Sequence, residues 1–226
     1  MRDTISTWAY MLFIACMQLF PSKLFEMVSK VDWYQAMLEK WVDSLLLSHP
    51  KAILEAGCAT GYVCHYIHTC GYDAIGIDAS PSMILEAKKN FHHHDFRVEN
   101  ALKTSFKSHS FDLVMSASLI NIVDAPEDLI YESARLCKMS GCVSYLFPVD
   151  TISAHQIDAF IKTHSFSNFS KAVLKFWLTF GRKLSINDVL DILDDNGFGY
   201  YQIDNFLDGM VVAIRASKVT LSHNLS

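Results

Sequence analysis

The chain has 226 residues, of which 51% are hydrophobic and 19% charged, and its formal net charge at pH 7 is -5. This length and composition predict one globular domain with extra elements and exclude an intrinsically disordered chain. The negative charge argues against the broad basic surface that nucleic-acid binding requires, so we expect no nucleic-acid partner.

An apolar run stands near the start of the sequence, from Trp8 to Phe20. It is too short to cross a hydrocarbon core of about 30 Å, and its flank has no net positive charge because Arg2 and Asp3 cancel. We expect an amphipathic or buried helix without stable membrane insertion, with a targeting or membrane-surface role as the alternative. After Pro21-Ser22, large apolar side chains recur at helical spacing, namely Trp33, Met37, Trp41 and Leu45. Residues 1–50 are therefore expected to form an N-terminal helical cap.

The next stretch predicts a β-α-β-α unit. A short apolar run ends in Glu55 and breaks into the turn Gly57-Cys58-Ala59-Thr60-Gly61, after which a helix begins at Tyr62. A second apolar run ends in Asp78, and Ser80-Pro81 then supplies an N-cap and a first-turn proline for the next helix.

Such a unit has a physical use in ligand binding. The glycines let the backbone approach a ligand closely, the following helix offers unpaired N–H groups, and Asp78 can accept from the two hydroxyls of a ribose. The sequence therefore predicts a nucleoside-containing cofactor. NAD and FAD are disfavoured, because Tyr62 stands where the dinucleotide fingerprint needs a small residue for close helix packing.

The rest of the chain continues the alternation of strands and helices. Strands are predicted at 96–98, 111–116 and 142–147, and a helix runs from Pro126 to about Leu136, before Ser140-Gly141. A capping box is predicted at Ser185-Ile186-Asn187-Asp188, where a further helix starts. Two final β runs, 200–206 and 210–216, are joined by a connection short enough to make them an antiparallel pair.

Neither the histidines nor the cysteines predict a metal site. The run His92-His93-His94-Asp95 cannot direct all its side chains to one ion from a regular element, so a solvated loop is favoured. The six cysteines show no C-x-x-C pair and are interpreted as the reduced thiols of a cytoplasmic protein. Cys58, inside the glycine turn, is expected to be a small filler beside the cofactor and not a nucleophile.

The segment 151–182 is unusually rich in aromatic residues. It contains Phe160, Phe166, Phe169, Phe176, Trp177 and Phe180. Side chains of this kind must be buried, and the nearest cavity lies above the carboxyl edge of the sheet, so we expect a lid over an apolar acceptor site. The alternative is a satellite helix pair with its own minor core.

The order and spacing of these elements closely resemble the class I S-adenosylmethionine-dependent methyltransferases, in particular their small-molecule branch. The similarity covers roughly Lys51 to Lys218 and rests on the segments ILEAGCATG, GIDASPSM, FDLVMS, ARLCKMSG and LDGMVVA. It implies an α/β fold with a Rossmann-like, seven-stranded, mostly parallel sheet and a C-terminal antiparallel hairpin, plus N-terminal helices and a helical lid insertion. The implied core is 51–218, with the lid at 151–182 and a tail at 219–226.

The resemblance also implies S-adenosylmethionine as the cofactor and a set of residues that contact it. The turn would surround the methionine part, Asp78 would take the ribose hydroxyls, and Asn100 replaces an Asp that in the family accepts from the adenine amino group. Ala59 replaces the middle glycine of the usual pattern, and its methyl group is tolerable if φ stays negative. The expected cofactor contacts are Glu55, Gly57, Cys58, Ala59, Gly61, Asp78, Ala79, Met83, Asn100, Ala101 and Ser116.

On the acceptor side, the expected substrate contacts are Trp33, Tyr34, Asn121, Phe147, Phe166 and Trp177. Trp33 and Tyr34 have the alternative of packing a helix against the sheet edge, and Asn121 that of capping its own loop. A sulfonium is already activated, so transfer mainly requires that donor and acceptor be held close and dry. Should a general base act, the candidates near the carboxyl edge are Asp150, His155 and His164.

The resemblance therefore implies methyl transfer from S-adenosylmethionine to an O, N, S or C nucleophile of a small, apolar or aromatic molecule. Two alternatives stay open. One is a methyltransferase acting on a protein or RNA, which would need an open groove or a basic face. The other is a protein that keeps the cofactor pocket without methylating anything.

Overall fold

The computed structural model describes residues 21–180 and 182–218, which contain seven strands and eight helices. The expected helix over Trp8 to Phe20 and the tail 219–226 lie outside the described residues. The strands are β1 Ile53–Ala56, β2 Ala74–Asp78, β3 Asp95–Val98, β4 Phe111–Ala117, β5 Cys137–Pro148, β6 Phe198–Phe206 and β7 Val211–Lys218. The helices are α2 Pro21–Val28, α3 Asp32–Leu46, α4 Tyr62–Thr69, α5 Pro81–Asn90, α6 Pro126–Leu136, α7 Ala154–Thr163, α8 Asn168–Phe180 and α9 Ile186–Asp195.

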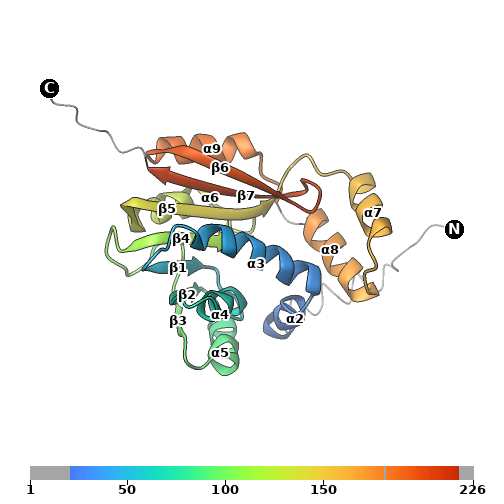
Figure 1. Ribbon diagram of the computed structural model, residues 1–226, viewed down its shortest axis with the longest axis horizontal. Coiled ribbons are helices and arrows are strands. Elements are labelled where there is room, and N and C mark those ends of the chain that lie inside the picture. Colours follow the sequence, from blue (N-terminus) through green and yellow to red (C-terminus); the bar gives the residue numbers. More distant parts are fainter. Residues whose placement is uncertain (1–20, 181, 219–226) are drawn as a thin grey trace.

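All seven strands join one sheet in the order β3-β2-β1-β4-β5-β7-β6. The pairs β2·β3, β1·β2, β1·β4 and β4·β5 are parallel, whereas β7 is antiparallel to both β5 and β6. The predicted fold, including the terminal hairpin, is therefore confirmed. In Figure 1 the hairpin with α9 forms one edge of the molecule, and β3 with α5 forms the opposite edge.

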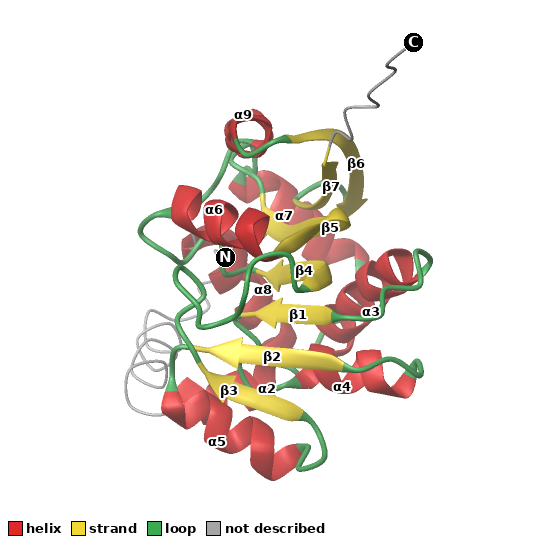
Figure 2. Cartoon of the chain, turned by 90° about the vertical axis from the view of Figure 1, so that its left-hand side faces the viewer, coloured by secondary structure: helices red, strands yellow, loops and turns green. Residues whose placement is uncertain are grey.

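The parallel strands end on a common side, which Figure 2 shows by the shared direction of the arrowheads of β1, β2 and β4. Strand order reverses between β1 and β4, because the chain runs outward to β3 and then returns to the other side of β1. This switch point opens a crevice at the carboxyl ends of the strands, which is where ligands bind in open α/β sheets.

The N-terminal helices follow the predicted apolar row. Trp33, Met37, Trp41 and Leu45 are all buried on α3, and the indole Nε1 of Trp41 donates to Ser144 Oγ of β5 at 3.0 Å. Pro21 stands in the first turn of α2, which suits a residue with a fixed φ and no N–H to pair. Helix α3 thus docks on the sheet through the buried side chain of Trp41.

Two details differ from the sequence-based expectation. The helix α6 ends at Leu136 as predicted, but β5 begins directly at Cys137, so Gly141 lies inside that strand and does not end the helix. Glycine is needed there because a Cβ would lie 2.7 Å from Asp112 O. The reciprocal capping box forms at Ser153 and Gln156 of α7, whereas Ser185 caps α9 by accepting from the N–H of Asn187.

The aromatic segment 151–182 forms α7 and α8, which lie together at one end of the sheet in Figure 1. Phe160, Val173, Leu174 and Leu178 are buried and belong to the main hydrophobic core. The two helices therefore share the core of the sheet and have no separate minor core.

Candidate cofactor site

The turn between β1 and α4 has an unusual backbone that neighbouring strands fix in place. Gly57 and Gly61 have φ of 78° and 88°, in the left-handed region that glycine tolerates best. The N–H groups of Gly57 and Cys58 both donate to Ile77 O, at 2.8 and 2.9 Å. A Cβ on Gly61 would lie 2.5 Å from Phe96 Cζ, so both conformation and packing require glycine there.

Ala59 differs from the sequence-based condition for tolerating its methyl group. Its φ is 45°, so it is left-handed and not negative. A left-handed conformation costs a non-glycine residue roughly 1–2 kcal/mol. The Ala59 N–H donates to Asp78 Oδ2 at 3.0 Å, and this charge-assisted bond offsets part of the strain. Strained backbone of this kind is held by its surroundings, and it clusters at functional sites.

Asp78 ends β2 and joins the turn to α5. Its Oδ1 accepts from the N–H of Ser80 at 2.9 Å, while Oδ2 accepts from Ala59. Burial raises the pKa of Asp78, and the two backbone N–H bonds oppose that shift. Each carboxylate oxygen has a second lone pair, so Asp78 can still accept from a ligand hydroxyl. Ser80 caps α5 as predicted, accepting from the N–H of Met83, with Pro81 in the first turn.

Glu55 is the most perturbed acid of the site. It is 3% exposed, and its Oε2 accepts from Cys64 N at 3.1 Å and from Cys64 Sγ at 3.0 Å. Burial raises the pKa of Glu55 to about 7, and the charge of Asp78 adds to the rise, while the bonds from Cys64 oppose it. No ion pair between Glu55 and a basic side chain forms within the described residues.

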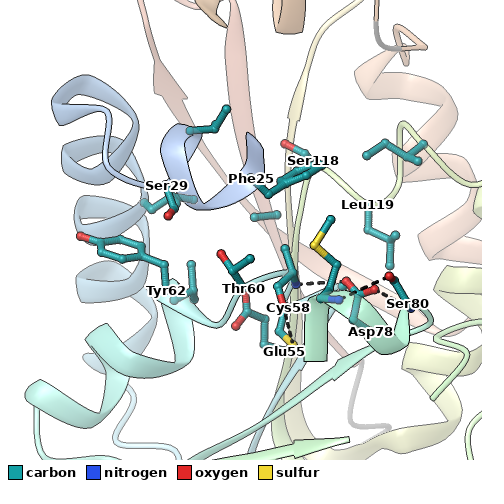
Figure 3. A pocket seen from close by; sticks show the side chains of 18 of the residues that line it. Phe25, Ser29, Glu55, Cys58, Thr60, Tyr62, Asp78, Ser80, Ser118 and Leu119 are labelled. Atoms are coloured by element: carbon teal, nitrogen blue, oxygen red, sulfur yellow. Dashed lines mark hydrogen bonds between the residues drawn. The ribbon is translucent and has the colours of Figure 1, made fainter. Parts of the chain in front are cut away.

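These groups surround one cavity of about 240 Å³. Figure 3 shows Glu55, Cys58 and Asp78 from the ends of β1 and β2, with Ser118 and Leu119 from the loop after β4. Phe25 of α2 and Ser29, directly after that helix, close the cavity from the N-terminal side. Its walls are mainly apolar. Most pockets that bind small molecules have this composition, with a few well-placed polar groups.

The cavity brings together some of the expected cofactor residues and not others. Those that line it are Glu55, Gly57, Cys58, Ala59, Asp78 and Met83. Gly61 does not line the cavity; it lies in the turn next to Phe96 and has a left-handed φ. Asn100 is exposed, and its Oδ1 accepts from the N–H of its neighbour Leu102 at 3.0 Å. Ser116 is buried within β4, and neither it nor Ala79 or Ala101 lines the cavity.

The expected acceptor residues divide in the same way. Tyr34 lines the cavity beside the Ser118 hydroxyl, and burial with the charge of Glu55 raises the pKa of its phenol to about 12. Trp33 and Trp177 stack with ring centroids 6.1 Å apart, and Phe166 meets Trp33 edge-on. The other two, Phe147 and Asn121, are buried, the former in the core of the sheet.

None of the three candidate bases lines the cavity. Asp150 and His155 are exposed at the start of the α7 region. His164 caps the end of α7, because its Nδ1 lies 2.8 Å from Phe160 O and its ring stacks on Phe166. Its position is thus explained by local structure.

Several lining residues were not identified from the sequence. Ser118 has a φ of 61° and is buried, and Leu119 follows it at the cavity wall. Their position directly after β4, at the carboxyl edge, is the signal that could have identified them. Phe25 of α2 and Ser29 just after it had no signal, since nothing in the sequence tells which face of that helix turns towards the cavity.

The histidine run lies at the opposite, amino edge of the strands. His94 packs against His65 and His68, with the ring centroids of His68 and His94 4.6 Å apart. Within residues 21–180 and 182–218, no three His, Cys, Asp or Glu side chains form a group that could hold a metal ion. In the same part of the chain, no helix is long and apolar enough to span a membrane.

Comparison with known proteins gives consistent results. Residues 54–145 match the family model described as a methyltransferase domain. A protein of invertebrate iridescent virus 6 named as a methyltransferase, 235L, is 29% identical over 87 residues, which is 38% of this chain and 32% of the viral protein. The chain thus matches about a third of the length of that relative.

Solved structures share the fold over most of the chain. Magnesium protoporphyrin IX methyltransferase from Synechocystis, with bound S-adenosylhomocysteine, has a TM-score of 0.62 and 16% identity, covering 82% of this chain and 84% of that one. A SAM-dependent methyltransferase from Thermotoga maritima has a TM-score of 0.66 and 18% identity, covering 92% and 100%.

The glycine turn, the acid at the tip of β2 and the crevice at the switch point define a Rossmann-like protein with a nucleoside-binding cavity. The domain match and the shared fold identify the chain more closely. Residues 54–145 match a methyltransferase domain, and the chain shares the fold of SAM-dependent methyltransferases of known structure.

Proposed function

We propose that this protein transfers a methyl group from S-adenosylmethionine (SAM) to an O, N, S or C nucleophile of a small, apolar or aromatic molecule. The observation that carries the proposal is the convergence of the glycine turn, Glu55 and Asp78 on one cavity. The cavity adjoins an aromatic cluster, formed by Trp33, Tyr34, Phe166 and Trp177.

The groups in the cavity fit the chemical parts of SAM. Asp78 has free acceptor capacity for the ribose hydroxyls. Glu55, buried without a basic partner among the described residues, fits the ammonium of the methionine part. The first turn of α4 leaves N–H groups without intrahelical partners, and these suit the methionine carboxylate.

SAM supplies a methyl group on a sulfonium, which is already a good leaving group, so the protein acts mainly by binding and positioning. The turn and Asp78 hold the donor, while the apolar walls exclude water from the transfer path. The aromatic cluster beside Tyr34 favours an apolar or aromatic acceptor, because such rings offer large apolar area and specific stacking geometry.

Two further features support a small acceptor in the cytoplasm. The net charge of -5 disfavours a nucleic acid as substrate. The described cysteines are all free thiols, as expected in a reducing compartment.

Calorimetry with SAM and with its demethylated product, S-adenosylhomocysteine (SAH), tests the cofactor site. We expect wild type to bind, and Asp78→Ala to weaken binding at least tenfold, since the variant loses the ribose acceptor and the bond that holds Ala59. Asp191→Ala, on the exposed side of α9, is the matched control and should bind normally. Failure of wild type to bind either ligand contradicts the proposal.

The acceptor class is tested by methyl transfer from labelled SAM to a panel of small aromatic and aliphatic nucleophiles, a protein extract and RNA. The proposal expects label only in small apolar or aromatic compounds. Label in protein or RNA would instead support the macromolecular alternative.

A further inference from the structure

A second cluster of polar side chains lies at the amino edge of the sheet, away from the cofactor cavity. His65 and His68 stand three residues apart on one face of α4, and His94 belongs to the loop between α5 and β3. The ring centroids of His65 and His94 are 5.6 Å apart, and those of His68 and His94 are 4.6 Å apart. Three imidazoles from two separate segments therefore meet in one place, and the sequence run 92–94 supplies only one of them.

Two of these rings have nitrogen atoms spaced as metal ligands. His65 Nδ1 lies 3.4 Å from His94 Nε2, which is long for a hydrogen bond, since its heavy atoms usually lie within about 3.2 Å of each other. Two nitrogen ligands on one tetrahedral Zn²⁺, each at about 2.0–2.1 Å from the ion, are about 3.3–3.4 Å apart. The spacing therefore suits one ion bound by both rings.

Aromatic neighbours hold the two rings in position. His65 stacks on Phe91 with centroids 4.3 Å apart, and His94 meets Phe96 edge-on at 6.0 Å. Burial lowers the pKa of both histidines, and neighbouring imidazoles add to that shift. Both rings are therefore neutral at pH 7, and a metal ion needs the lone pair of a neutral imidazole.

His68 is placed to supply a third ligand. Its Nδ1 lies 3.4 Å from Asp73 Oδ1, which leaves Nε2 for an ion. A carboxylate on the far nitrogen of a ligating histidine is the usual outer partner in metal sites, because it fixes the tautomer. As they stand, the described residues form no group of three ligands, so His68 must turn toward the other two. Its side chain is 53% exposed and has room to do so.

Space and charge at this edge also suit a cation. A cavity of about 420 Å³ gives room for water to complete the coordination, and its lining includes His68, His94, Asp73 and Asp95. Lys51 lines it as well, so two acids face one lysine or arginine among the described lining residues. Within residues 21–180 and 182–218, Asp73 forms no ion pair except with His68.

We propose that His65, His68 and His94 bind one divalent transition-metal ion of the kind that prefers imidazole, with Zn²⁺ as the probe. Imidazole suits Zn²⁺, Cu²⁺ and Ni²⁺, whereas Mg²⁺ and Ca²⁺ prefer oxygen ligands. The ion ties α4 to the loop before β3. Cys64 lines the same cavity but is not a ligand, because its thiol donates to Glu55 and burial raises its pKa. The site does not depend on the proposed methyl transfer, since it lies at the other edge of the sheet.

Isothermal titration calorimetry with Zn²⁺ in a buffer without chelators or SAM measures the site directly. We expect wild type to bind one ion, and Mg²⁺ at the same concentrations not to bind. His65→Gln and His94→Gln keep a polar side chain of similar size without an imidazole. Each should weaken Zn²⁺ binding at least tenfold, because the loss of an outer partner alone typically costs about 10–100-fold.

His92→Gln is the matched control. It makes the same chemical change in the same loop, but the ring of His92 packs on that of His93, with centroids 4.1 Å apart. This variant should bind Zn²⁺ as wild type does. Asp73→Asn, which keeps all three imidazoles and removes the outer carboxylate, should weaken binding about tenfold.

Three results would overturn the proposal. They are no binding of Zn²⁺ to wild type, equal affinity of wild type and both His65→Gln and His94→Gln, and a loss of binding in His92→Gln alone. If a variant does not fold, as thermal unfolding without metal will show, Co²⁺ bound to wild type decides. The intense visible absorption of a four-coordinate ion supports the site, and the weak absorption of the six-coordinate aqueous ion contradicts it. All these measurements omit SAM, so their failure leaves the proposed function untouched.

Discussion

Glu55 allows a quantitative test of the site in the protein without ligand. Replacing it by glutamine keeps the shape of the side chain and removes its charge. The wild-type group has a pKa of about 7 in the folded protein, against 4.5 for an unperturbed glutamate, a rise of about 2.5 units. At 1.36 kcal/mol per unit, this corresponds to roughly 3 kcal/mol of destabilisation once Glu55 is ionised.

The sign follows from proton binding. A raised pKa means that the folded state binds the proton more tightly than the unfolded state does. Wild-type stability therefore falls as pH rises from about 4.5 to about 7, and the full loss remains above that range. With these two pKa values, the destabilisation contributed by Glu55 is roughly 1 kcal/mol at pH 5 and roughly 3 kcal/mol at pH 8.

Urea unfolding at pH 5 and pH 8 measures the effect. The stability difference between Glu55→Gln and wild type should increase by roughly 2 kcal/mol, in favour of the variant, on going from pH 5 to pH 8. Because the free energies of unfolding are compared at two pH values, any pH-independent destabilisation caused by the new amide cancels. The same variant should bind SAM more weakly, so stability and ligand binding change in opposite directions.

Glu127→Gln supplies the control, because it makes the same chemical change at an exposed position of α6. It should show almost no change between the two pH values. Parallel stability profiles for wild type and Glu55→Gln would refute the view that burial without a basic partner raises the pKa of Glu55.

Two substitutions test the packing around the site. Gly61→Ala should destabilise the protein by more than the roughly 1–2 kcal/mol of a left-handed alanine and should abolish cofactor binding, because its Cβ would lie 2.5 Å from Phe96 Cζ. Gly71→Ala, at a similar φ of 86° with no atom within 4 Å, should cost the conformational term alone by urea unfolding. Trp41→Phe should cost about 2–4 kcal/mol in the same assay, since it leaves a cavity and removes the bond to Ser144; a loss under 1 kcal/mol would contradict that contact.

The sequence predicted the local elements of this protein well, because they depend on short-range patterns. Apolar runs bounded by turn residues located β1, β2 and β4, and a first-turn proline marked α5 and α6. The short connection between the last two β runs predicted the hairpin, and the resemblance to the methyltransferases implied the seven-stranded sheet. The convergence of the glycine turn and Asp78 also followed, since parallel strands end at a common edge.

The backbone conformation of the turn and the closure of the cavity depend on contacts between residues far apart in the sequence. Ala59 has a left-handed φ and donates its N–H to Asp78, which lies 19 residues away, and sequence spacing does not specify this arrangement. Tyr34 was expected to line an acceptor site, yet it lines the same cavity as Glu55 because α3 docks along the sheet through Trp41. The orientation of that helix depends on packing against distant residues.

By itself, then, the sequence predicted the β-α-β-α unit, a nucleoside-containing ligand and the two strand tips that converge, since each rests on residue type and near spacing. The family resemblance added the expected fold class and S-adenosylmethionine as the expected cofactor. Only the tertiary structure decided how α2, α3 and the loop after β4 close the cavity. It also decided that Glu55 is buried without a positive partner in the described chain. Burial and charge balance are sums over neighbours far apart in sequence, so no local pattern can report them.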